Sequence, residues 1–208
     1  MDTHLPEASL PPLVAIVAGG ASRRMGRDKA LMPAGADGRT LLALVAAAAR
    51  QAGLEVLVVG RTADALPPDM PPDCHAIPDE KPGRGPLGGL QTALHAAHGA
   101  DVILCACDVP RITPACFRWL RQQSSSIAGH CPGDGIVPVW QGHDQPLFAL
   151  YRQSAAPLVS ELIARDSLSM NALLRAGRFL RVDLPIPLAG AVTDWDTPTD
   201  IELNPASR

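Results

Sequence analysis

LVAIVAGGASRRMGRDK, residues 13–29, joins an unbroken apolar run to a basic loop that is rich in glycine. The apolar part, Leu13 to Ala18, has the continuous hydrophobicity of a strand that is buried on both faces. Strands of this kind occur in parallel sheets with helices on either side. Because open α/β sheets bind their ligands at the carboxyl ends of the strands, the loop over residues 19–28 marks a candidate binding site.

Helical and strand-like segments alternate beyond this loop, up to about residue 120. In order, the pattern predicts a helix over 41–52 capped by Thr40, a buried strand over 56–59, a proline-rich loop over 61–74, a helix over 85–98, a buried strand over 102–107 and a helix that begins at Thr113-Pro114. Alternation of this kind implies βαβ units. The expected core is therefore a parallel sheet with helices on both of its faces.

The second half of the sequence is less regular. It predicts strands over 136–140 and 147–151 joined by a polar turn over 141–145, helices near 155–165 and 168–176, a strand over 179–184 and a helix that begins at Thr197-Pro198. A chain of 208 residues corresponds to one domain. We expect a flexible N-terminal tail over 1–11 and a single domain over 12–208.

Composition and charge exclude several classes of protein. Lys and Arg number 18 against 21 Asp and Glu, which gives a net charge of −3, and only 3% of the residues are aromatic. Dedicated nucleic-acid binders are usually basic and often stack bases on aromatic side chains, so we expect no nucleic-acid partner. The longest apolar run, Leu41 to Ala49, is far too short to span a bilayer, and the acidic start is unlike a signal peptide. We therefore expect no membrane partner.

The cysteines indicate a reducing compartment. They are Cys74, Cys105, Cys107, Cys116 and Cys131. Their odd number and the absence of CxxC spacing argue against both a disulfide framework and a zinc site. We expect reduced thiols and a cytoplasmic location.

The basic loop is the strongest functional signal. It places four cations in an acidic chain, namely Arg23, Arg24, Arg27 and Lys29. A Walker A loop does not fit, because Gly26 is followed by Arg rather than by Lys, and Gly19-Gly20 lacks the spacing of a dinucleotide fingerprint. What remains is a loop whose backbone N–H groups can approach a phosphate chain closely, beside a cluster of positive charge. The alternative is a solvated basic loop after a strand.

Two acidic positions complete the candidate site. Asp108 follows the predicted strand over 102–107, where its carboxylate suits Mg²⁺, which prefers carboxylate, water and phosphate oxygens. Asp79 precedes the segment Gly83 to Gly89, whose small residues let a flat base lie close to the backbone. A carboxylate at Asp79 suits the N1–H and exocyclic amine of guanine. The alternatives are a capping role for Asp108 and a plain turn over 83–89.

Other acidic and histidine positions carry weaker signals. Asp194 and Asp196 point the same way in an extended chain, which suits either a metal or substrate site or a helix cap. His95 and His98 are predicted to be ordinary residues on a helix surface. His143 lies in the polar turn, where contact with a substrate and the absence of any role are equally open.

The sequence AGGASRRMGRDKAL resembles the signature of the MobA-like nucleotidyltransferases, and among them that of the molybdenum cofactor guanylyltransferases. The resemblance extends from Val14 to Ile201 and includes GPLGGL at 85–90, CDVP at 107–110, HDQPLFALY at 143–151 and DTPTDI at 196–201. It implies a doubly wound, Rossmann-like nucleotidyltransferase fold with a mostly parallel sheet in three layers, α/β/α. It also implies transfer of GMP from GTP to the phosphate of molybdopterin with Mg²⁺, and transient contact with other cofactor-biosynthesis proteins or molybdoenzymes.

The same resemblance implies roles for individual positions. Lys29 binds the phosphates, Asp79 contacts the nucleoside, and Asp108 holds Mg²⁺ together with a phosphate of GTP. The expected catalytic residues are Arg23, Arg24, Lys29 and Asp108, and the expected metal ligand is Asp108. The residues expected to bind the nucleotide are Val17, Ala18, Gly19, Gly20, Lys29, Gly60, Asp79, Gly85 and Asp108.

Two positions depart from the family pattern. Gly60 stands where the family often has Asn after the second strand, and Asp194-Trp195-Asp196-Thr197-Pro198 replaces an Asn-x-Asn-Thr-Pro motif. The second departure is similar to the related cytidylyltransferases, whereas the first loop and the GPLGG motif favour guanine. Transfer of cytidylyl or another nucleotidyl group stays open as an alternative, and a non-catalytic nucleotide-binding module is a third hypothesis.

Overall fold

The computed structural model describes residues 10–19, 28–34, 37–127 and 133–191. Within these ranges the strands are β1 (Leu13–Val17), β2 (Val56–Val59), β3 (Cys74–Ile77), β4 (Val102–Ala106), β5 (Gly135–Trp140), β6 (His143–Asp144), β7 (Phe148–Tyr151) and β8 (Phe179–Asp183). The α-helices are α1 (Leu41–Gln51), α2 (Gly85–Ala96), α3 (Pro114–Ile127), α4 (Ala156–Ala164), α5 (Met170–Ala176) and α6 (Ile186–Ala189). Short 3₁₀ turns are η1 (Lys29–Leu31), η2 (Ala63–Ala65) and η3 (Gln153–Ala155).

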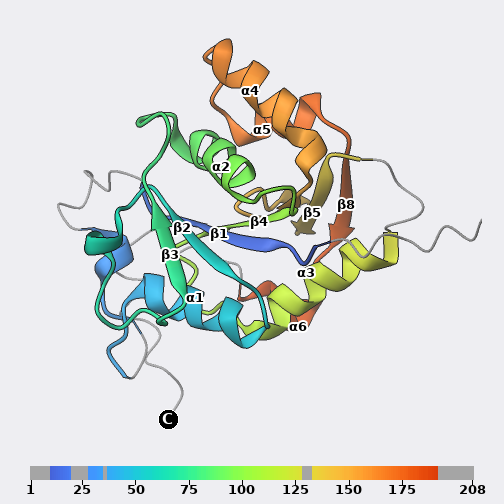
Figure 1. Ribbon diagram of the computed structural model, residues 1–208. Coiled ribbons are helices and arrows are strands. Elements are labelled where there is room, and N and C mark those ends of the chain that lie inside the picture. Colours follow the sequence, from blue (N-terminus) through green and yellow to red (C-terminus); the bar gives the residue numbers. More distant parts are fainter. Residues whose placement is uncertain (1–9, 20–27, 35–36, 128–132, 192–208) are drawn as a thin grey trace, which may run out of the picture.

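These elements form three layers around one mixed sheet (Figure 1). In the view of Figure 1, α2, α4 and α5 lie above the sheet, and α1, α3 and α6 lie below it. This confirms the three-layer α/β/α architecture predicted from the sequence. None of the described helices is long and apolar enough to cross a bilayer.

The sheet is mostly parallel. Its order is β3-β2-β1-β4-β7-β5-β6, and β8 pairs with β5. The pairs β1–β2, β2–β3, β1–β4 and β5–β8 are parallel, whereas β6 and β7 run antiparallel to their neighbours. From β1 the chain moves outward to β2 and β3 and then returns to the other side of β1 to form β4. This reversal confirms the doubly wound topology and creates a crevice between the carboxyl ends of β1 and β4.

Two apolar cores lie on the two faces of the sheet, because alternate residues of a strand point to opposite sides. Val14 and Ile16 of β1 pack into the core that contains residues of α1, α3 and α6. Ala15, between them, packs into the core that contains residues of α2, α4 and α5. All three side chains are completely buried. Burial on both faces explains why β1 is an unbroken apolar run in the sequence rather than an alternating one.

The predicted elements up to residue 184 are present, and the differences concern short or exposed segments. The sequence does not predict β3, which forms an edge of the sheet and whose side chains are half-buried or exposed. The turn predicted over 141–145 contains β6, joined to β5 by Gln141 and Gly142. Both of these residues have positive φ, 50° and 77°, as a tight two-residue hairpin requires. The helix predicted from Thr197 lies outside the described residues.

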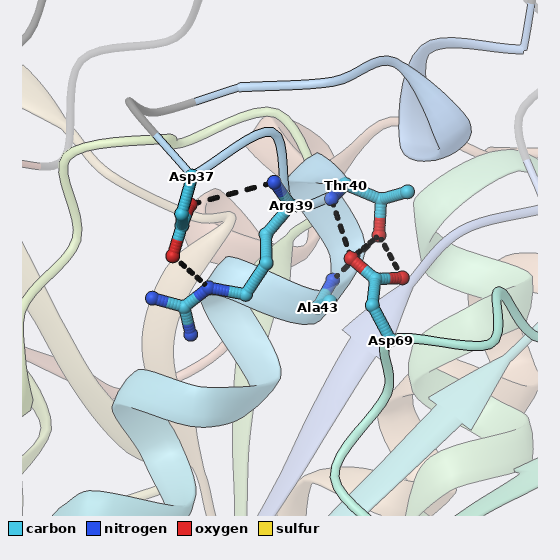
Figure 2. A network of polar contacts seen from close by, with 5 residues as sticks. All are labelled: Asp37, Arg39, Thr40, Ala43 and Asp69. Atoms are coloured by element: carbon cyan, nitrogen blue, oxygen red, sulfur yellow. Dashed lines mark hydrogen bonds and ion pairs between the residues drawn. The ribbon is translucent and has the colours of Figure 1, made fainter.

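The predicted cap of α1 is present and has an additional partner (Figure 2). The Thr40 hydroxyl oxygen accepts a hydrogen bond from the Ala43 N–H at 3.3 Å. Asp69, from the loop before β3, accepts hydrogen bonds from the Thr40 N–H at 2.7 Å and from the Thr40 hydroxyl at 3.0 Å. One threonine therefore closes the helix end and fastens it to a loop 29 residues further along the chain.

Candidate functional site

A pocket of about 510 Å³ opens at the carboxyl end of the parallel strands, at the crevice between β1 and β4. Its lining comes from the ends of β1, β2 and β4, from η1, from the segment after β3 and from the start of α2. The lining residues are Val17, Ala18, Gly19, Asp28, Lys29, Ala30, Val59, Asp79, Gly83, Gly85, Pro86, Gly89, Ala106, Cys107, Asp108 and Leu147. The topology alone predicts a ligand site at this place.

Lys29 and Asp108 form an ion pair in the wall of the pocket. The Lys29 Nζ lies 3.5 Å from the Asp108 Oδ2, and the two side chains are 20% and 24% exposed. Lys29 opens η1, and Asp28 caps this turn by accepting a hydrogen bond from the Ala30 N–H at 3.1 Å. Asp108 follows β4 by two residues. A cation that suits a phosphate and a carboxylate that suits a metal thus lie side by side.

Two glycines bring the ends of β1 and β2 into direct backbone contact. Gly60 has a φ of +90°, and a Cβ there would lie 2.5 Å from the Gly19 Cα. A Cβ on Gly19 would in turn lie 2.8 Å from the Asp79 Oδ2. No larger residue fits between these strand ends without displacing them. The contact gives a physical reason for glycine at position 60 of this chain.

Asp79 is a partly desolvated hydrogen-bond acceptor in the same wall. It is half-buried, and burial raises the pKa of its carboxyl above the ordinary range. A carboxylate with reduced hydration gains more from a donor on a ligand than an exposed one does. The site therefore has an acceptor at Asp79 in addition to the ion pair of Lys29 and Asp108.

The start of α2 supplies the small residues of the pocket. Gly85 has a φ of +60°, and Gly83 has a φ of +82°, so the chain turns sharply into the helix. A Cβ on Gly89 would lie 2.7 Å from the Val17 Cγ1, which means that α2 packs tightly onto β1. These glycines serve close packing and an open pocket at once. The two interpretations weighed for this segment, turn and binding surface, are therefore compatible.

Most of the residues predicted for the site converge in this pocket. Its lining contains Val17, Ala18, Gly19, Lys29, Asp79, Gly85 and Asp108. Gly60 lines an adjoining hollow of about 370 Å³ that shares Ala18, Gly19 and Asp28 with the pocket. Gly20, Arg23, Arg24, Asp194 and Asp196 lie outside the described residues.

The sequence analysis missed an ion pair between Arg61 and Asp28 at the base of the basic loop. The Arg61 side chain is only 10% exposed, and its Nη2 lies 2.6 Å and 2.5 Å from the two Asp28 carboxylate oxygens. Arg61 directly follows Gly60 at the end of a buried strand. A charged residue at the carboxyl end of a central strand is the signal that was available, but the proline-rich composition of 61–74 indicated only a loop.

Among the described residues, the other titratable groups do not form a second centre. The described cysteines are free thiols, and burial raises the pKa of Cys107, in the pocket wall, to about 12, so this thiol stays protonated. His95 pairs with Glu80 at 2.9 Å on the surface of α2, and His143 is exposed in β6 outside the pocket lining. No group of three or more His, Cys, Asp or Glu side chains in the described ranges is arranged to hold a metal ion.

Comparison with known proteins agrees with this geometry. The family model of the MobA-like NTP transferase domain matches residues 14–181, which include the strands and loops that form the pocket. The chain belongs to the MobA-like NTP transferase family. It is therefore a nucleotidyltransferase, as the sequence predicts.

Curated relatives of this NTP transferase carry a more specific name. A probable molybdenum cofactor guanylyltransferase of Carboxydothermus hydrogenoformans is 34% identical over 155 residues, which cover 74% of this chain and 73% of the relative. A protein of the same name from Chloroflexus aggregans is 32% identical over 197 residues, covering 90% of each chain.

Several solved structures share the fold of this NTP transferase. Molybdopterin-guanine dinucleotide biosynthesis protein A of Archaeoglobus fulgidus superposes with a TM-score of 0.73 at 21% identity, covering 91% of this chain and 95% of the other. A 2-C-methyl-D-erythritol 4-phosphate cytidylyltransferase of Thermus thermophilus gives a TM-score of 0.65 at 18% identity, covering 93% and 97%. Rv0371c of Mycobacterium tuberculosis, solved in complex with manganese, gives a TM-score of 0.61 at 20% identity, covering 93% of this chain and 97% of the other. The fold is thus shared by one protein named for a guanine dinucleotide and by another named as a cytidylyltransferase.

Proposed function

We propose that this chain transfers the GMP moiety of GTP to the phosphate of molybdopterin and releases pyrophosphate. The observation that carries the proposal is the pocket between the carboxyl ends of β1 and β4. There Lys29 pairs with Asp108, and Asp79 supplies a half-buried acceptor. Supporting it are curated relatives at 32–34% identity that are named as probable molybdenum cofactor guanylyltransferases.

In this proposal the pocket divides between the base and the phosphates. The Asp79 carboxylate accepts from the N1–H and the exocyclic amine of guanine, two adjacent donors that cytosine does not offer. Lys29 binds the triphosphate together with Arg23 and Arg24 of the basic loop. The small residues Val17, Ala18, Gly19 and Gly85 of the wall leave room for the nucleoside close to the backbone. Gly60 lines the adjoining hollow.

The donor set of the pocket fits Mg²⁺. This ion usually takes one or two protein carboxylates and completes its shell with water and substrate phosphates rather than with a cage of side chains. Asp108 supplies one carboxylate in the wall, and the described residues contain no cage around it. When bound there, the cation would neutralise charge on the triphosphate and on the departing pyrophosphate.

The chemistry requires positioning more than proton transfer. The second pKa of a phosphate monoester is about 6, so the acceptor phosphate is already mostly dianionic at pH 7. One of its oxygens attacks the α-phosphorus of GTP, the bond from this phosphorus to the bridging oxygen breaks, and that oxygen leaves with pyrophosphate. No general base is needed. Lys29, Arg23 and Arg24 reduce the repulsion between the two anions and hold them in line.

Further expectations belong to the same proposal. The chain acts as a single domain over 12–208 in the cytoplasm, where its thiols stay reduced. Its substrates are small molecules, and any contact with cofactor-biosynthesis proteins or molybdoenzymes is transient.

Release of pyrophosphate tests the proposal. Each of the four NTPs is incubated with the protein, Mg²⁺ and molybdopterin, and pyrophosphate is measured with and without the acceptor. We expect acceptor-dependent release that is fastest with GTP. A preference for CTP would instead make the chain a cytidylyltransferase, and binding of GTP without release from any NTP would make it a binding module.

A further inference from the structure

The Arg61 side chain is almost fully shielded from solvent, and among the described residues its guanidinium pairs with Asp28. Its guanidinium lies within 2.6 Å of both carboxylate oxygens of Asp28, and the side chain is 10% exposed. The Nε of the same group is buried and has no hydrogen-bond acceptor among the described residues. Burial of an incompletely satisfied guanidinium is costly, so this ion pair contributes little net stability. What it does provide is a fixed position for Asp28.

Asp28 transmits this position to Lys29. Its Oδ1 accepts both from Arg61 and from the Ala30 N–H, the hydrogen bond that caps η1. Lys29 is the first residue of η1, and its ammonium lies 3.5 Å from the Asp108 carboxylate in the wall of the pocket. A shift of Asp28 would therefore rotate or open the turn from which Lys29 projects.

Arg61 is itself held by the sheet. The N–H groups of Gly60 and Arg61 both donate to the Ile77 carbonyl oxygen, at 2.9 Å and 3.3 Å, at the end of β3. Asp79 follows this carbonyl by two residues. The arginine thus ties the basic loop after β1 to the ends of β2 and β3, which carry the other side of the pocket.

We propose that Arg61 is a positioning residue that sets the direction of Lys29 toward the triphosphate by holding Asp28. The inference rests on the proposed role of Lys29 in binding phosphate. Arg61 contacts neither substrate nor metal in this scheme. Its guanidinium suits the task because it is a rigid plane, one nitrogen of which, Nη2, reaches both Asp28 oxygens, whereas the lysine ammonium is a point charge on a flexible stem.

Labelling of lysine tests the position of Lys29 without any nucleotide. The sequence contains two lysines, Lys29 and Lys81, and Lys81 is exposed. Trace acetylation with acetic anhydride, followed by mass spectrometry, gives the ratio of modification at the two amines. In the chain without substitutions we expect a low ratio of acetylation at Lys29 to acetylation at Lys81, because Lys29 is 20% exposed and paired with Asp108. In Arg61→Met we expect the ratio to rise several-fold, with Lys81 unchanged.

A double-mutant cycle on GTP binding tests whether Arg61 acts through Lys29. With Mg²⁺ present, Arg61→Met should weaken binding by about tenfold, and Arg61→Lys should recover part of the loss. Lys29→Ala should weaken binding at least as much. Adding Arg61→Met to Lys29→Ala should cause no further loss, because the group that Arg61 positions is already absent.

Arg50 offers a matched control. It forms a more exposed Arg–Asp ion pair with Asp73 at 3.0 Å, outside the pocket lining, so Arg50→Met should change neither readout. An unchanged labelling ratio in folded Arg61→Met, or additive losses in the cycle, overturns the proposal. If Arg61→Met does not fold, Asp28→Asn replaces it, because the amide oxygen still caps η1 but carries no charge for Arg61. If the unmodified chain binds no GTP, the proposed function fails while the labelling ratio still decides the role of Arg61.

Discussion

Lys29 begins η1 and places its ammonium 3.5 Å from Asp108 in the pocket wall. Removing this side chain should therefore weaken the binding of the phosphates of GTP and leave folding unchanged. We expect Lys29→Ala to lower kcat/KM for GTP by about 10²–10³, the range seen when one preorganised donor to developing charge is removed. The measurement is steady-state release of pyrophosphate. Its control is the thermal unfolding midpoint, which should stay close to that of the unmodified chain. Turnover at the unmodified rate would contradict the assignment.

Asp108 has the opposite role, since its carboxylate is the metal ligand in the proposed site. Asp108→Asn keeps the shape of the side chain but removes the charge that a dication needs. We expect metal-dependent GTP binding to weaken by about 10–100-fold, as in sites that lose a group supporting the metal. Titration of GTP binding against Mg²⁺ concentration measures this. A variant with the same Mg²⁺ dependence as the original chain would remove Asp108 from the metal site.

Asp79 should decide the choice of base. Its carboxylate can take two donors from guanine, so Asp79→Ala should reduce the preference for GTP over CTP by about 1–3 kcal/mol. Because burial raises the pKa of Asp79, its carboxyl takes up a proton at a higher pH than an ordinary Asp does. The preference should therefore fade on the acid side before exposed carboxylates titrate. The ratio of kcat/KM for GTP and CTP, measured across pH, checks both expectations. A preference that survives the substitution would separate Asp79 from base recognition.

The residues of the pocket differ in how well the sequence reveals them. Lys29 could be predicted because it ends the basic, glycine-containing loop. Asp79 precedes a segment of small residues, and Asp108 follows an apolar strand. Arg61 could not be predicted, because its partner Asp28 lies 33 residues away and the intervening chain gives no sign that the two meet. The close contact of Gly19 with Gly60 was equally hidden, since glycine after a strand indicates a turn whether or not another backbone lies against it.

At the scale of elements, the junction between α1 and the loop before β3 is the clearest test of local stability. Asp69→Ala removes the charged acceptor to which the Thr40 N–H and the Thr40 hydroxyl donate. We expect a loss of about 1–3 kcal/mol in the free energy of unfolding, measured by urea denaturation. Asp73→Ala is the matched control, because the Asp73 side chain is 71% exposed in its ion pair with Arg50. It should change stability by less than about 1 kcal/mol. Equal losses for the two variants would contradict a stabilising role for the contact between Asp69 and Thr40.

Helices and central strands could be predicted because burial leaves a direct trace in the sequence. β1, β2 and β4 are covered on both faces and appear as unbroken apolar runs, and α1 has a threonine cap at one end. β3 has no such trace. It is an edge strand of four residues, CHAI, whose side chains are half-buried or exposed, so nothing in its composition separates it from the loop before it. Its position is set by pairing with β2, which is a property of the sheet.

At the scale of the whole molecule, the order of the strands is the part that lies furthest from the sequence. A mostly parallel sheet follows from the alternation of helices and strands. The insertion of antiparallel β7 between β4 and β5 does not, because it depends on pairs such as Val102 with Tyr151, which are far apart along the chain. The position of the pocket could nevertheless be predicted without the place of β7. It depends only on the reversal beside β1, which the first half of the chain already contains.

The ion pair between Lys29 and Asp108 in the pocket wall has a thermodynamic consequence. Lys29 and Asp108 neutralise each other's charge. A nucleotide phosphate that binds Lys29 therefore leaves the Asp108 carboxylate without its cation. A cation that binds Asp108 likewise leaves the Lys29 ammonium without its anion. Binding of either ligand alone costs the free energy of this ion pair. When both bind, Lys29 is neutralised by the phosphates and Asp108 by the cation, so neither charge is left unpaired. Binding should therefore be heterotropically cooperative, with Mg²⁺ and GTP each raising the affinity for the other by the same factor. Calorimetric titration of each ligand in the absence and presence of the other measures that factor. In Lys29→Ala the factor should fall, since Asp108 then accepts the cation with no partner to displace.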